Sequence, residues 1–176
     1  MRAFVAIDAR DPAPSPSRAP AHLTVRFLGD VAESRIPAIG AALRPVAERF
    51  RPFFVTFEGV GAFPSRAAPR VVWVGVGEGR ATVERLAEDV TTALDGVGFP
   101  REPGAFVAHL TLFRVRSESD RSRARSLLEG RVPPPEPRRV RVDELVLKES
   151  TLGPSGPSHR TVERFPFAGG SEERAD

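Results

Sequence analysis

The tripeptide His-Leu-Thr occurs twice in the chain, at 22–24 and at 109–111, and it uses two of the three histidines. An imidazole has an ordinary pKa of ~6.5, so near neutral pH one ring can accept a proton while another donates one. A threonine hydroxyl beside each ring can donate a hydrogen bond to an anionic oxygen. Two such pairs that share a cleft would suit in-line displacement at phosphorus.

Each tripeptide begins a run of apolar and β-favouring residues, which predicts a strand at each place. Side chains i and i+2 of a strand share a face, so the histidine and threonine of each tripeptide are expected to point the same way. Leu23 and Leu110 then point oppositely, into the core. The two strands together predict one site built from two halves.

The same alternation predicts the orientation of other side chains near the tripeptides. Arg26 lies two residues beyond Thr24 and is therefore a candidate phosphate ligand on the same face. Arg114 follows His109 by an odd number of residues, so simple pleating turns it away, whereas a bulge or the strand end would return it as a phosphate partner. His159 lacks the threonine context and is expected on the surface or at the rim of the site.

Phe27 and Trp73 are expected in the core rather than as platforms for a nucleobase. The chain has no cysteine, and no carboxylate stands at ligand spacing from either motif histidine, so we expect no metal. No glycine-rich phosphate loop is present, which makes nucleoside triphosphates poor candidates, and we expect no cofactor.

The chain has 176 residues, of which 40% are hydrophobic, and this composition is ordinary for a globular protein. No apolar run approaches the ~20 residues of a membrane span, and the apolar start is too short for a signal peptide. We therefore expect a cytoplasmic protein without membrane contact. The net charge is +3 and nearly every basic residue is arginine. Arginine suits phosphate binding, but a GC-rich genome would also produce this bias, and we favour that explanation because a charge of +3 is modest.

Periodicity predicts three helices and a larger number of strands. Helices are expected at 34–50, 80–97 and 119–129, and strands at 3–7, 52–61, 70–77, 138–149 and 160–167 besides the two motif strands. Four prolines in 8–21 predict an extended connector, and a second proline-rich spacer covers 133–137.

The two halves of the chain match in element order, because 22–77 and 109–167 each run strand, helix, strand, turn-rich loop, strand. A helix precedes the second motif, whereas only the proline connector precedes the first. We therefore predict one α+β domain, residues 1–167, with a disordered tail at 168–176. It should form two pseudosymmetric lobes around a central cleft, each an antiparallel-rich sheet with helices on its outer face, and the first lobe should lack one helix.

These motifs resemble the two-histidine phosphoesterases, in particular the RNA 2′,3′-cyclic phosphodiesterases formerly called 2′-5′ RNA ligases. The pattern His-x-Thr-x-x-Phe-Leu-Gly spans His22–Gly29, and His-x-Thr-Leu-x-Arg spans His109–Arg114. Supporting matches are residues 2–8, 63–76 and 147–150. Members usually carry a helix where this chain has its proline connector, and a tyrosine is common near the position of His159.

The resemblance implies hydrolysis of a terminal 2′,3′-cyclic phosphate to a 2′-phosphate, without a metal. It implies that His109 accepts the proton of the attacking water and that His22 protonates the departing 3′ oxygen. Thr24, Thr111 and Arg114 would bind the phosphate, with Arg26 as a further candidate. The substrates would be RNA ends or nucleoside 2′,3′-cyclic phosphates, and we expect a monomer.

The sequence leaves other functions open. The same site run backwards is a 2′-5′ RNA ligase, and a protein that binds RNA ends with weak catalysis is a further alternative. A cyclic dinucleotide or an ADP-ribose cyclic phosphate is also open as the substrate. Symmetry between the two motifs alone does not tell which histidine is the acid.

Overall fold

The computed structural model describes residues 1–8, 22–136, 138–153 and 156–169. The proline connector and most of the predicted tail, residues 9–21 and 170–176, lie outside these ranges. The elements in chain order are β1 (Arg2–Asp8), β2 (His22–Asp30), the short helix η1 (Glu33–Arg35), α1 (Ile36–Glu48), β3 (Phe53–Pro64), β4 (Pro69–Val76), α2 (Arg80–Asp95), β5 (His109–Arg114), α3 (Glu118–Leu128), β6 (Arg138–Val142), β7 (Glu144–Gly153) and β8 (Gly156–Pro166).

All three predicted helices are present, and local sequence explains their limits. Pro37 lies in the first turn of α1, where its missing N–H is not needed, and Pro45 lies inside that helix without ending it. α3 begins at a capping box, in which the Ser117 hydroxyl accepts from the Asp120 backbone N–H and the Asp120 carboxylate accepts from the Ser117 backbone N–H.

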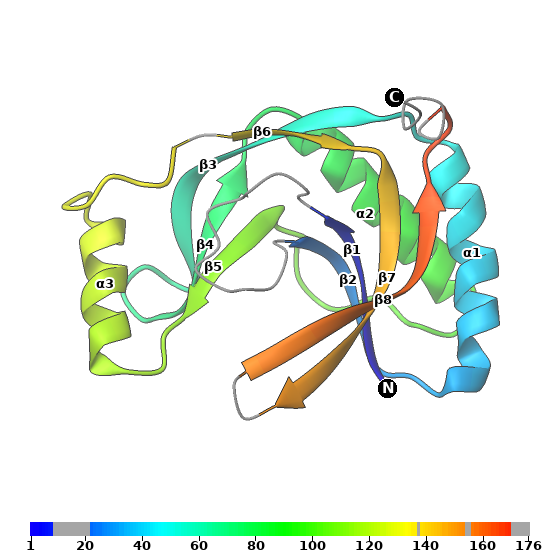
Figure 1. Cartoon of the computed structure of the whole chain (residues 1–176), viewed down its shortest axis with the longest axis horizontal. Helices are drawn as coiled ribbons and strands as arrows, with labels where there is room; N and C mark the ends of the chain where they lie inside the picture. Colours follow the sequence, from blue (N-terminus) through cyan, green and yellow to red (C-terminus); the bar gives the residue numbers. More distant parts are fainter. Residues whose placement is uncertain (9–21, 137, 154–155, 170–176) are drawn as a thin grey trace.

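The described strands form two four-stranded antiparallel sheets (Figure 1), which agrees with the prediction of two antiparallel-rich sheets. The first sheet has the order β2-β1-β7-β8, and the second has the order β5-β4-β3-β6. β2 and β5, which carry the two His-Leu-Thr motifs, are edge strands of their respective sheets, and they contact each other. The fold therefore brings the two motifs together where the sheets meet.

The two sheets do not correspond to the two halves of the sequence. β3 and β4 follow the first motif but pair in the sheet of the second, whereas β7 and β8 follow the second motif and pair in the sheet of the first. The single strand predicted at 138–149 is wrong, because the chain leaves one sheet and enters the other at Asp143. Alternation along a sequence does not reveal such a change of partner, which depends on non-local pairing.

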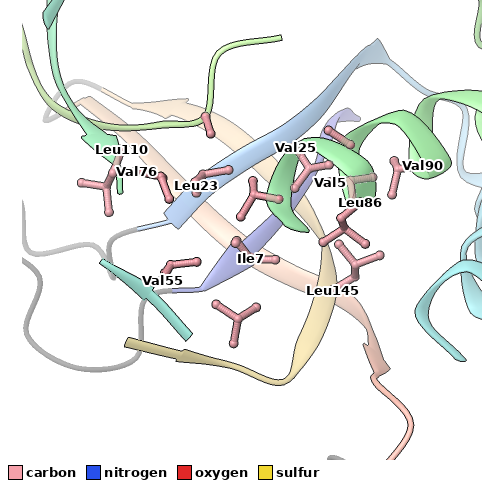
Figure 2. Close-up of a cluster of buried hydrophobic side chains, with 14 of the residues drawn as sticks. Val5, Ile7, Leu23, Val25, Val55, Val76, Leu86, Val90, Leu110 and Leu145 are labelled. Carbon is pink, nitrogen blue, oxygen red and sulfur yellow. The ribbon is translucent and has the colours of Figure 1, made fainter. Parts of the chain in front are cut away.

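One hydrophobic core joins the sheets and helices, and Figure 2 shows part of it. Leu23 of β2 and Leu110 of β5 are both buried in this core, which confirms their predicted orientation. Leu86 and Val90 of α2 pack among the same cluster (Figure 2). Since both leucines point into one core, the histidines and threonines on the opposite faces of β2 and β5 point away from it.

The helices are distributed unequally among the described elements. α2 packs against β2 and α1, and α1 packs against β8, so both lie on the sheet that carries His22. α3 packs against β3 and β4 of the sheet that carries His109. The helix expected to be missing from the first lobe concerns residues 9–21, which the structure does not describe. Among the described helices, none is long and apolar enough to cross a membrane.

Candidate active site

Residues from both motifs line a single cavity of about 510 Å³. Thr24 of the first motif and His109 of the second are both in its wall, together with Phe27 and Phe63. His22, Thr111 and Arg114 do not line this cavity, although each lies on a strand that borders it. The cavity therefore opens beside the line along which β2 and β5 meet.

A β-bulge in β2 decides which side chains accompany His22 and Thr24. Along β1, Ala6 pairs with Thr24 and Val5 pairs with Arg26, so Val25 is an extra residue in β2. Beyond such a bulge the alternation of faces is reversed. Arg26 therefore leaves the strand face of His22 and Thr24 and pairs with Val5, although it is still among the residues that line the cavity.

Arg26 instead fixes the segment that precedes β5. Its side chain is only 7% exposed, and its guanidinium donates to the carbonyl oxygen of Pro100 and pairs with Glu102 at 3.2 Å. The residue that the bulge returns to the face of Thr24 is Phe27, which pairs with Phe4 of β1. Phe27 is 53% exposed, so the expectation that it belongs to the core is wrong.

A second bulge, in β5, has the corresponding effect on Arg114. Trp73 of β4 pairs with Thr111 and Val72 pairs with Phe113, so Leu112 is the extra residue. Val71 and Trp73 share one face of β4, and Val71 pairs with Arg114. Arg114 therefore lies on the same face as Thr111, by the bulge that the sequence analysis named as one route.

Trp73 lies on this face as well, rather than in the core. Its ring centroid is 5.9 Å from that of His109 and 5.3 Å from that of Phe63. The Phe63 ring meets His109 edge-on at 4.9 Å. Two aromatic rings thus surround the His109 imidazole and restrict its rotation.

The hydrogen bond that His109 makes to Val107 fixes its tautomer. Nδ1 lies 2.7 Å from the Val107 carbonyl oxygen, which only accepts, so Nδ1 carries the proton. The neutral ring therefore has its lone pair on Nε2. Burial lowers the pKa of His109 below its ordinary 6.5, and the hydrogen bond to Val107 offsets part of this effect. Near neutral pH His109 is suited to accept a proton.

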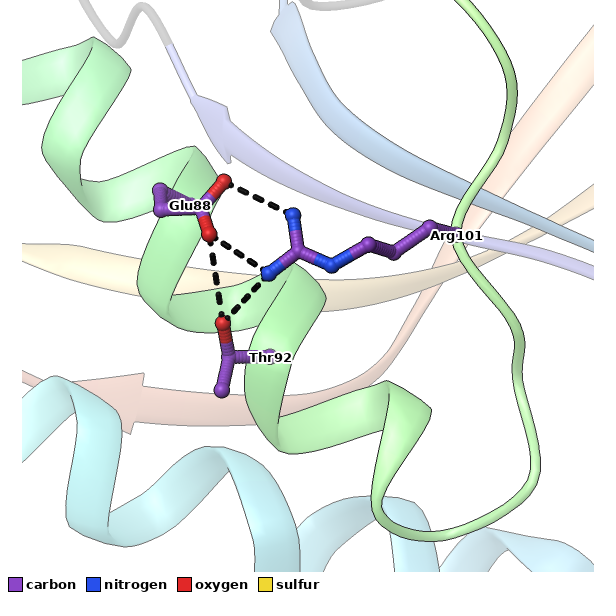
Figure 3. Close-up of polar contacts among 3 residues, drawn as sticks. All are labelled: Glu88, Thr92 and Arg101. Carbon is purple, nitrogen blue, oxygen red and sulfur yellow. Dashed lines mark hydrogen bonds and ion pairs between the residues drawn. The ribbon is translucent and has the colours of Figure 1, made fainter.

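The remaining walls of the cavity come from α2 and from residues 101–107. Arg101 fastens this segment to the helix by donating to both carboxylate oxygens of Glu88 and to the Thr92 hydroxyl, as Figure 3 shows. The bonds from Arg101 hold the pKa of the Glu88 carboxyl below its ordinary value. The cavity thus combines apolar rings with ionised side chains.

His22 belongs to a group of three aromatic rings on the first sheet. Its centroid is 5.1 Å from that of Phe4 and 4.8 Å from that of His159. His159 was expected on the surface or at the rim of the site, and β8 places it half-buried and directly beside the first motif. In the sequence, His159 lies in the strand that follows Leu147–Ser150. Its place beside His22 depends on the pairing of β7 with β1 and with β8, which local sequence does not reveal.

A buried ion pair lies beneath this group. Lys148, the only lysine in the chain, is 4% exposed, and its Nζ lies 2.7 Å from Asp8 Oδ1. Asp8 is the cross-strand partner of His22. Among the described residues, no three histidine, aspartate or glutamate side chains gather closely enough to hold a metal ion.

Comparison with known proteins gives consistent matches over most of the chain. The RNA 2′,3′-cyclic phosphodiesterase of Aeropyrum pernix is 37% identical over 143 residues, which are 80% of this chain and 78% of that protein. The RNA 2′,3′-cyclic phosphodiesterase of Archaeoglobus fulgidus is 37% identical over 144 residues, 82% of this chain and 78% of its own.

Solved structures agree with the sequence matches. The crystal structure of TT0787 of Thermus thermophilus has a TM-score of 0.73 at 25% identity, and the match covers 96% of this chain and 98% of that one. E. coli LigT complexed with 3′-AMP has the same fold, with a TM-score of 0.66 over 95% of this chain and 98% of its own. The family model for the 2′-5′ RNA ligase superfamily matches residues 4–153. With both motifs, the fold and these relatives in agreement, the chain belongs to the 2′-5′ RNA ligase superfamily.

Proposed function

We propose that the chain is an RNA 2′,3′-cyclic phosphodiesterase that leaves a 2′-phosphate and uses no metal. The observation that carries the proposal is that Thr24 and His109, one from each motif, line the same cavity. Two relatives that are each 37% identical to this chain are named RNA 2′,3′-cyclic phosphodiesterases. A cyclic phosphate bound between the motifs would meet an imidazole and a hydroxyl from each side.

In the proposed reaction His109 is the general base. Its Nε2 accepts a proton from water as the water oxygen bonds to phosphorus, opposite the 3′ oxygen. His22 donates a proton to that 3′ oxygen as the bond between phosphorus and O3′ breaks. The fixed tautomer of His109 and its lowered pKa support this assignment of the base, and His22 is then the acid.

Three further side chains would stabilise the pentacoordinate phosphorus. The hydroxyls of Thr24 and Thr111 donate hydrogen bonds to its non-bridging oxygens, and the guanidinium of Arg114 adds positive charge. All three lie on the same strand faces as the two histidines. Arg26 is not included, because its guanidinium already binds Pro100 and Glu102.

The cavity of about 510 Å³ offers space for the nucleoside that carries the cyclic phosphate. Its volume lies within the range of about 300–1,000 Å³ that is usual for small-molecule sites. Phe27 and Phe63 supply apolar surface for a base, and Thr24 and His109 adjoin the phosphate end. RNA ends and nucleoside 2′,3′-cyclic phosphates are therefore the proposed substrates.

We further propose that residues 1–167 form one domain that works as a cytoplasmic monomer. Both motifs come from one chain, and one core joins the two sheets, so a second copy is not needed to complete the site. Sedimentation of the purified protein at the concentrations of the assay tests this proposal. A dimer at those concentrations would contradict it.

The test of the function uses an oligonucleotide that ends in a 2′,3′-cyclic phosphate. His22→Ala and His109→Ala are each expected to lower turnover by about 100- to 10,000-fold, because each removes a proton-transfer group. Ser158→Ala, an exposed position on β8, is the matched control. Wild-type turnover in either histidine variant, or loss of wild-type activity in chelator, would refute the proposal. An added RNA with a 5′-hydroxyl end shows whether ligation competes with hydrolysis.

A further inference from the structure

Three aromatic rings meet in one group on the first sheet, and each contacts the other two. The His22 centroid is 5.1 Å from that of Phe4 and 4.8 Å from that of His159. Phe4 and His159 are 5.2 Å apart. His159 meets both of the other rings nearly at right angles, with interplanar angles of 81°. The His22 ring therefore packs against both an apolar ring and a second imidazole.

Three strands of different origin build this group. Phe4 is on β1 and is 2% exposed, so it forms a rigid support. His22 is on β2, the neighbour of β1. His159 comes from β8, on the far side of β7, where it pairs with Ser150. The side chain of His159 thus belongs to a strand that carries no other motif residue, yet it reaches the catalytic strand.

Hydrogen bonding does not explain where the His159 ring lies. Its Nδ1 is buried and has no hydrogen-bond partner. A buried polar atom without a partner is costly, so it is retained only where another interaction compensates. The interaction that the structure offers is the edge-to-face packing against His22 and Phe4.

The surroundings of His159 favour the neutral form of its ring. Burial is the main cause that lowers the pKa of His159 below 6.5, and the ammonium group of Lys148 lowers it further. Lys148 faces the group from β7, Asp8 faces it from β1 as the partner of Lys148, and His22 faces it from β2. A neutral His159 places no second positive charge beside a protonated His22.

We propose that His159 is a positioning residue that holds the His22 imidazole in the orientation from which it donates its proton. This inference rests on the role of His22 given under the proposed function. It assigns to β8 a part in the reaction although His159 itself does not contact the phosphate in the proposed mechanism. A ring free to rotate about its side-chain bonds would reach the departing oxygen less often.

The first test compares His159→Ala with His159→Phe on a 2′,3′-cyclic-phosphate-ended oligonucleotide. His159→Ala is expected to lower kcat by about 10- to 100-fold with KM unchanged, because the misplaced group acts in the transition state. His159→Phe keeps a flat ring and should restore most of kcat. Ser158→Ala, its exposed neighbour, should behave as wild type. Wild-type kcat in His159→Ala, or no recovery in folded His159→Phe, would overturn the proposal.

The second test does not depend on turnover. The chain has three histidines, so its imidazole proton resonances are few and can be assigned by substitution. The ring protons of His22 should move in His159→Ala and stay near their wild-type position in His159→Phe. Unchanged His22 resonances in His159→Ala would show that the ring is held without His159. If His22→Ala kept wild-type turnover, the function of His22 would fail, while this measurement would still decide whether His159 orients the ring.

Discussion

The Nδ1 atom of His109 lies 2.7 Å from the carbonyl oxygen of Val107, two residues earlier in the chain. A carbonyl oxygen only accepts, so this contact leaves the lone pair of the neutral ring on Nε2. His109 is thereby prepared to accept a proton at Nε2.

The pH dependence of activity should reflect this environment. His109 must be neutral to accept a proton, and burial lowers its pKa below 6.5. The neutral form therefore persists to lower pH than for an exposed histidine, and kcat/KM should fall only as the pH drops through the lowered pKa. A pH profile of kcat/KM on a cyclic-phosphate-ended oligonucleotide measures this. An acid limb centred at or above 6.5 would contradict the assignment of His109 as the base.

The two threonines should contribute to turnover rather than to folding. Thr24→Val and Thr111→Val keep the shape of the side chain and remove the hydroxyl donor. Each is expected to lower kcat by about 10- to 1,000-fold, as expected for one lost donor to a transition-state anion. Thr151→Val, at an exposed position of β7, is the control and should be close to wild type. Equal turnover in Thr24→Val and wild type would exclude that hydroxyl from the phosphate site.

Substitution of Arg114 should lower activity, whereas substitution of Arg26 should mainly lower stability. Arg114→Ala is expected to lower kcat/KM with no change in the free energy of unfolding, because the side chain is exposed and on the face of Thr111. Arg114→Lys should recover only part of the activity, since an ammonium group lacks the bidentate geometry. Steady-state kinetics and urea denaturation together make the comparison. Full activity in Arg114→Ala would remove it from the proposed mechanism.

Arg26→Met is expected to act mainly on stability. It leaves the Pro100 carbonyl without its donor and Glu102 without its partner. The free energy of unfolding should fall by about 1–3 kcal/mol, mostly through the orphaned backbone acceptor, because Glu102 itself is largely exposed. Urea denaturation measures the change. A loss of kcat with unchanged stability would instead favour Arg26 as a phosphate ligand.

The buried pair of Lys148 and Asp8 should be sensitive to the loss of one partner. Lys148→Met leaves the Asp8 carboxylate, whose side chain is 11% exposed, without its ammonium partner at 2.7 Å. The expected cost is about 3–5 kcal/mol of unfolding free energy, and the double variant Asp8→Asn with Lys148→Met should recover much of it. Denaturant titration of the single and double variants tests this. Equal stability of Lys148→Met and wild type would show that the pair does not matter for folding.

Much of this molecule could be predicted from local sequence. The two His-Leu-Thr motifs, their strands, the burial of Leu23 and Leu110 and all three helices follow from residue types and periodicity, which act within a few residues. The pairing of the motifs predicted one site, and Thr24 and His109 do line one cavity.

The tertiary structure decided what local periodicity does not encode. Single extra residues, Val25 in β2 and Leu112 in β5, reverse the alternation of faces, so Phe27 and Arg114 share the faces of the motif threonines. Arg26 leaves the face of Thr24 but still lines the cavity. A bulge is defined by the partner strand, and the partner of each strand is chosen by non-local contacts. For the same reason, the change of sheet at Asp143 and the position of His159 beside His22 depend on the pairing of β7 and β8 with the first sheet.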